Sequence, residues 1–95
     1  MFKLKDNIDL KELEKFDYTY KDMFGAYTKN VNVSGIYTMT ILVNVKNSQF
    51  RDREIHFHSS NWMDLIISKE RQAYFIKELI DAELVEEREY AKINW

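Results

Sequence analysis

Residues 37–45, YTMTILVNV, form the stretch that decides the fold. This stretch is rich in β-branched and aromatic side chains, which suit the pleated, half-buried surface of a strand. Successive side chains of a strand point to opposite faces of the sheet. One face then carries the apolar residues Tyr37, Met39, Ile41, Val43 and Val45, and the other carries Thr38, Thr40, Leu42 and Asn44. The pattern predicts a strand whose apolar face, called the core face below, lies against the core.

The residues before this stretch predict a hairpin, with its loop at residues 34–36. A three-residue loop there pairs Val31 with Met39, so that apolar side chains meet on one face. A two-residue turn at 34–35 would instead set Met39 opposite Asn30. Because a slip of one residue moves every side chain to the other face, we expect the first register.

The stretch DREIHFHSSNW, residues 52–62, predicts the next strand. Ile55 and Phe57 alternate in it with the polar residues Asp52, Glu54, His56 and His58. Burying a polar group without a partner costs about 1–3 kcal/mol, so we expect a connecting loop of three or five residues, which turns Ile55 and Phe57 to the core. His56 is then expected near Thr40 and Asn30, and His58 near Thr38 and Asn32.

Helical patterns flank the strands. Asp9, followed three residues later by Glu12, predicts a capped helix over about 9–16. Ser68 predicts the cap of a helix that runs to about Ala82, and SSNWMDLII, residues 59–67, predicts a short helix before it. We therefore expect a two-layer α+β fold: an N-terminal helix, a three-stranded antiparallel β-meander, and C-terminal helices on one face. VEEREY, residues 85–90, could add a short edge strand.

Length and composition limit the classes of protein that fit. The 95 residues are 45% hydrophobic and 32% charged, as in an ordinary globular domain, and we expect a single domain over residues 1–95. The sequence holds no cysteine, which excludes disulfides and thiolate chemistry. No apolar run is long enough to cross a bilayer. With a net charge of −2 and no concentrated basic patch, the chain is not expected to bind nucleic acid, and we expect a cytoplasmic location.

Two segments carry a resemblance. IDLKELEKF, residues 8–16, and FIKELIDAELVE, residues 75–86, bracket the predicted strands. In this they resemble small uncharacterised proteins of Firmicutes and their phages, a family for which the resemblance implies no established activity. Similar sequences carry a glycine in an LIxAGLV pattern, where this chain has Glu83, so its helix is expected to end differently or to continue. The second segment also resembles the helix that leads into the wing of a winged-helix protein.

The two histidines define a candidate for metal or acid–base chemistry. His56 and His58 share a strand face, a spacing that suits zinc ligands, and Glu54 on the same face could supply a third ligand. Since the sequence holds neither a further histidine nor any cysteine, we expect no resident metal and no cofactor, and assign no catalytic residue. An enzyme that uses these three side chains stays an alternative.

The preferred hypothesis is a protein-interaction face. Asn and Thr side chains of the hairpin share a sheet face with Glu54 and the histidines, and together they form a patch of hydrogen-bond donors and acceptors. We call it the polar face; it consists of Asn30, Asn32, Thr38, Thr40, Glu54, His56 and His58. The function expected is that of a small non-enzymatic interaction protein of phage or mobile-element type, which binds a protein partner or a second copy of itself as a homodimer. A nucleic-acid-binding winged helix is the remaining alternative.

Overall fold

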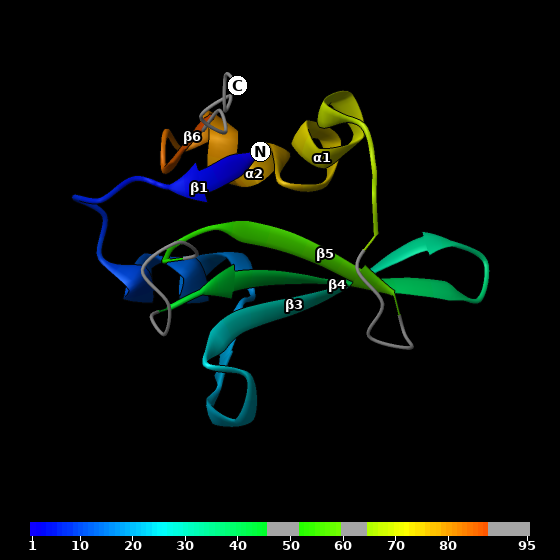
Figure 1. Cartoon of the computed structure of the whole chain (residues 1–95), viewed down its shortest axis with the longest axis horizontal. Coiled ribbons are helices and arrows are strands. Elements are labelled where there is room, and N and C mark those ends of the chain that lie inside the picture. The colour runs from blue at the N-terminus through cyan, green and yellow to red at the C-terminus, as the bar shows by residue number, and fades with distance from the viewer. Residues whose placement is uncertain (46–51, 60–64, 88–95) are drawn as a thin grey trace, which may run out of the picture.

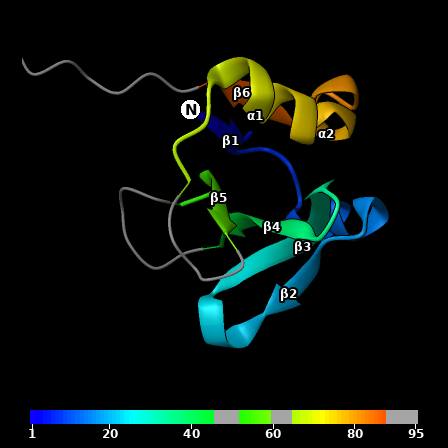
Figure 2. The same cartoon turned by 90° about the vertical axis from the view of Figure 1, so that its right-hand side faces the viewer.

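The computed structural model of the chain describes residues 1–45, 52–59 and 65–87. The main sheet is antiparallel, with strand order β2-β3-β4-β5, and a second sheet pairs β1 with β6. Figures 1 and 2 show α1, α2 and the β1–β6 sheet together on one side of the main sheet. In chain order the elements are β1 (Phe2–Leu4), the 3-10 helix η1 (Leu10–Phe16), β2 (Thr19–Lys21), the 3-10 helix η2 (Asp22–Phe24), β3 (Ala26–Ser34), β4 (Tyr37–Asn44), β5 (Ile55–Ser59), α1 (Lys69–Phe75), α2 (Lys77–Asp81) and β6 (Val85–Glu87).

The expected helix-led, two-layer α+β fold is wrong. Strands make up 42% and helices 29% of the described residues. The strands form a four-stranded and a two-stranded sheet in place of one three-stranded meander. The N-terminal segment explains part of the difference. Phe2 and Leu4 are buried on either side of the half-buried Lys3, an alternation typical of a strand, and this segment pairs with β6. β2 adds a fourth strand to the main sheet, joined to β3 by η2 and Gly25, which has φ +59°.

The predicted register of the first hairpin is confirmed. Val31 pairs with Met39 and Tyr27 with Val43. The loop differs, because Ser34 pairs with Tyr37 and the register shifts between Asn32 and Ser34. A β-bulge thus accommodates the extra residue, which allows a tight two-residue turn while leaving the apolar side chains in register.

The core-face placement of Ile55 and Phe57 is also confirmed. Ile55 pairs with Val43 and Phe57 with Ile41, and all four side chains are buried. The predicted connecting loop lies largely outside the described residues, but its end is visible at Arg53, which has φ +65°. The Arg53 amide donates to the Asn44 carbonyl, and the Asn44 amide donates to the Glu54 carbonyl. Two residues therefore oppose one, as in a bulge that usually places glycine where Arg53 stands.

Two of the three helical segments that the sequence predicted are present in altered form. Asp9 caps the first, accepting from the Lys11 amide at 2.9 Å, but the helix is 3-10 and Glu12 binds Lys15 instead of reaching back to the cap. Ser68 caps the second, whose helix is interrupted at Ile76. The short helix expected from residue 59 lies partly outside the described residues, and residues 65–67 are not helical.

The two helical segments end in the same way. Asp17 and Glu83 both have positive φ, 70° and 60°. The residue after each donates five positions back, from Tyr18 to the Leu13 carbonyl and from Leu84 to the Leu79 carbonyl. This is the Schellman arrangement, in which glycine is usual at the left-handed position. The expectation that Glu83 would end its helix differently, or let it continue, is thus corrected.

The core lies between the main sheet and the side formed by α1, α2 and the β1–β6 sheet (Figure 1). Its fully buried side chains come from β1, η1, β4, β5 and the α1–α2 segment, among them Leu4, Leu13, Ile41, Ile55, Ile76 and Leu79. Phe57 of β5 contacts Phe75 of α1, with ring centroids 6.5 Å apart. Arg53 donates to the Lys5 and Ile8 carbonyls, at 2.8 Å each, and so ties the N-terminal segment to the sheet. No helix in the described ranges is long and apolar enough to span a bilayer.

Candidate functional site

The polar face divides into an exposed end and a buried end. Asn30, Asn32 and Thr38 are exposed near the tip of the β3–β4 hairpin. Thr40 is buried and donates to the Asn30 side-chain oxygen at 2.8 Å. Farther from the tip the same face is buried, since Glu54 is only 3% exposed and Leu42 only 7%. The seven side chains therefore do not form one solvent-facing patch.

Both histidines lie opposite β4 residues that are two positions farther from the hairpin tip than predicted. His56 is opposite Leu42, and His58 is opposite Thr40, whereas we expected them beside Thr40 and Thr38. The bulge at Arg53 and Glu54 belongs to the connection that sets this register. As a result, His56 lies next to an apolar side chain, and only His58 lies beside the hydroxyl and amide groups of the hairpin.

Glu54 and His56 form a close pair on this face. His56 Nε2 lies 3.0 Å from Glu54 Oε1, and both side chains are largely buried. A carboxylate at this distance can form a hydrogen bond with an imidazole and fix the orientation of its ring. Among the residues that the structure describes, no group of three or more His, Cys, Asp or Glu side chains is arranged to hold a metal ion.

The tip of the β3–β4 hairpin carries exposed apolar side chains next to Asn32 and Thr38 of the polar face. Ile36 is 90% exposed, Tyr37 is 70% exposed and Val33 is 38% exposed. The tip extends at the right of Figure 1, beyond the rest of the molecule. The prediction that Tyr37 belongs to the core is therefore wrong. Its side chain points to the core face, but it lies beyond the end of the core, a position that alternation alone does not reveal.

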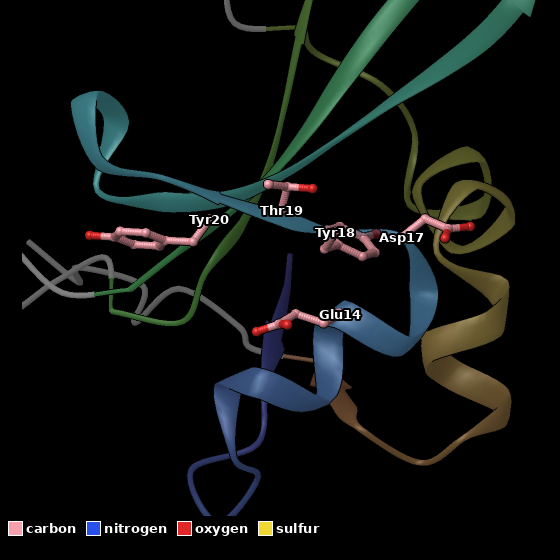
Figure 3. Close-up of a pocket in the computed structure, with 5 residues that line it drawn as sticks. All are labelled: Glu14, Asp17, Tyr18, Thr19 and Tyr20. Carbon is pink, nitrogen blue, oxygen red and sulfur yellow. The ribbon is translucent and has the colours of Figure 1, made fainter.

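A hollow of about 500 Å³ lies between the end of η1 and β2. It is lined by Glu14, Asp17, Tyr18, Thr19 and Tyr20, shown in Figure 3. Glu14 and Asp17 lie on either side of the Tyr18 ring and do not converge on one point (Figure 3). The sequence analysis missed this hollow although its lining residues lie within residues 14–20, because the short strand β2 was not predicted and with it the turn at Asp17 that follows η1.

Tyr18 is the buried member of this group. Burial, and then the negative charge of Glu78, raise the pKa of the Tyr18 phenol well above its usual value. The Lys29 ammonium lies 5.5 Å from the centre of the Tyr18 ring and forms an ion pair with Glu78. Tyr18 is therefore a neutral, packed side chain that fixes the end of β2 against β3 and α2.

Comparisons with known proteins supply no further guide. No protein-family model, curated protein or solved structure matches this chain.

Proposed function

We propose that this chain is a small non-catalytic protein-interaction module that acts in the cytoplasm. The observation that carries the proposal is the protruding hairpin tip with its exposed Ile36 and Tyr37. Aromatic and aliphatic side chains that fill a pocket of a partner commonly supply most of the binding energy of an interface. The exposed Asn30, Asn32 and Thr38 lie beside them and can supply the polar rim.

The resemblance of the two helical segments to small proteins of Firmicutes and their phages supports a phage or mobile-element type for the module. The partner in this proposal is another protein, with a second copy of the chain as the alternative.

The test compares two substitutions at the tip with one elsewhere. Ile36→Ser and Tyr37→Ser are expected to abolish capture of a specific protein from a lysate of the cell that makes the chain. Ile66→Ser is the matched control, because Ile66 is a fully exposed isoleucine in the segment before α1. A captured protein that the tip variants lose and the control keeps supports the proposal. A set of captured proteins that is the same for all variants would contradict it.

The Glu54–His56 pair supports a second candidate, a metal-dependent or acid–base enzyme. Its largely buried imidazole and adjacent carboxylate resemble the oriented base of many active sites. Metal analysis of protein prepared without a histidine tag tests the metal form of this idea. Stoichiometric zinc, manganese or nickel, lost in His56→Ala, would favour it, whereas metal-free protein whose melting a chelator does not change would rule that form out.

A further inference from the structure

The outer edge of β3 is paired along only part of its length. β2 pairs with Ala26, Tyr27 and Thr28 only, because its first residue, Thr19, lies opposite Thr28. β3 continues to Ser34, and the rest of it pairs with β4 alone. Figure 2 shows β2 as the outermost strand of the sheet on this side. The second half of β3 therefore forms an edge of the sheet.

The hydrogen-bond alternation shows which backbone groups this edge presents. The Asn44 amide and carbonyl both bond on the β5 side of β4, to Glu54 and Arg53. The alternate residues of β4 therefore face β3, and the β3 residues that bond to them are Tyr27, Lys29 and Val31. The residues between them turn their amides and carbonyls to the outer side. Thr28 bonds there to β2, as its pairing with Thr19 indicates. Asn30 and Asn32 have no such partner among the described residues.

The start of β2 explains why the edge of β3 is open beyond Thr28. Extending the β2 register places Tyr18 opposite Lys29, which agrees with the contact between their side chains, and Asp17 opposite Asn30. Asp17 adopts the left-handed conformation, and the chain turns away there. No strand therefore pairs with Asn30 and Asn32 on this side among the described residues, and the extended register places the exposed Asp17 at the inner end of the free edge.

We propose that this free edge, from Asn30 to Asn32, binds an extended segment of another protein as an added antiparallel strand, with a Lys or Arg of that segment next to Asp17. The inference rests on the proposed function and specifies its partner. An antiparallel strand would exchange both backbone hydrogen bonds with Asn30 and both with Asn32. No described residue forms an ion pair with Asp17, so its carboxylate is available for a basic side chain.

The side chains around the edge define what the segment should contain. Asn30 and Asn32 lie on the polar face, and Val31 and the exposed Val33 follow them on the hairpin. Side chains directly opposite on neighbouring strands contact each other. The preferred segment therefore alternates polar and apolar residues over three positions and has its basic residue at the C-terminal end, since it continues the direction of β2. A second copy fits less well, because its own hairpin tip would point toward β2 of the first copy.

Displayed random heptapeptides, selected against the full chain and then synthesised, provide the probe. The key variant is Asn32→Pro, which removes the outward amide and leaves the bonds to β4 intact. Asn32→Thr is the matched control, because it changes the side chain and keeps the amide. We expect selected peptides to show the alternation and the basic residue, to bind Asn32→Pro at least about tenfold more weakly, and to bind Asn32→Thr within about threefold of the wild type.

Asp17→Asn tests the charge, since asparagine also tolerates the left-handed conformation. It should weaken peptide binding several-fold at low salt and less at high salt. Amide hydrogen exchange should show fast exchange at Asn30 and Asn32 in the free chain and protection of both in the complex.

Several outcomes would overturn the inference. These are a selection that enriches no peptide, peptides that bind Asn32→Pro as tightly as wild type, and protection that appears away from residues 30–32. A concentration-dependent dimer that Asn32→Pro abolishes would show that the occupant is a second copy. A partner lost in Ile36→Ser but kept in Asn32→Pro would leave the proposed function standing and refute the added strand alone.

Discussion

The two halves of β3 differ although they belong to one continuous strand. Ala26, Tyr27 and Thr28 are buried and pair with a strand on each side. Asn30, Asn32 and Ser34 are exposed and pair with β4 only. The first half holds the sheet together, and the second half presents backbone, amide side chains and the apolar tip to the surroundings.

The difference shows that the turn before a neighbouring strand can decide how much of a strand is paired on both sides. The first half is covered because η2 and Gly25 return the chain directly onto it. The second half is open because η1 ends in the left-handed turn at Asp17, so the residues before β2 are helical and do not run beside β3. Open edges invite pairing with another chain, and here the bulge between Asn32 and Ser34 keeps the open stretch short.

The largest expected effect comes from breaking the buried part of the hairpin. Ile41 is fully buried on β4, so Ile41→Ala should lower the free energy of unfolding by about 2–5 kcal/mol. Ile36→Ala at the tip removes the same atoms from an exposed side chain and should change it by less than about 0.5 kcal/mol. Urea denaturation of both variants measures the difference. Equal losses would show that the tip is packed in solution.

Proline substitution compares the two halves of β3 directly. Thr28→Pro removes an amide that pairs with β2 and leaves a carbonyl of β2 without its donor, which should cost about 2–3 kcal/mol. Asn32→Pro removes an amide that faces outward and should cost less than about 1 kcal/mol. Thermal and urea unfolding of the pair test this expectation. A large loss in Asn32→Pro would mean that its amide is already bonded.

Glycine at the two helix ends tests the left-handed turns at Asp17 and Glu83, of which the first leaves the edge of β3 open. Glu83→Gly should raise the free energy of unfolding by about 0.5–1 kcal/mol, because glycine adopts the left-handed conformation without strain. Asp17→Gly should raise it less, since a short polar side chain tolerates that conformation better than glutamate does. Urea midpoints of the two variants provide the measurement. A loss of stability in Glu83→Gly would indicate that its side chain makes a contact that outweighs the strain.

The smallest effect at neutral pH is expected for Tyr18→Phe. The pKa of Tyr18 is raised in the folded chain, so the unfolded chain loses this proton first as the pH rises past about 10. The stabilisation is therefore complete below that pH and declines above it. Tyr18→Phe should stay near wild type at pH 7 and lose less stability than wild type between pH 9 and about 11. Parallel alkaline slopes for the two proteins would contradict the buried, neutral phenol.

Much of the local structure was predictable from the sequence. Alternation in residues 37–45 indicated the strand and its core face, and apolar matching placed Val31 opposite Met39. Ser68 and Asp9 marked the helix starts. The N-terminal strand was missed because three residues carry too short a pattern to outweigh the helix signal that follows. The left-handed Glu83 was missed because local preference favours glycine, whereas burial of Leu79 and Leu84 stabilises the turn.

The sequence by itself determined which way each strand side chain points, because the period of two is a property of the extended backbone. Only the tertiary structure decided what covers those side chains. It buried Glu54 and Leu42 on a face that alternation marked as polar, exposed Tyr37 on the core face, and left the edge at Asn30 and Asn32 open. Exposure depends on where distant segments such as Asp17 turn, and no local pattern within a strand contains that information.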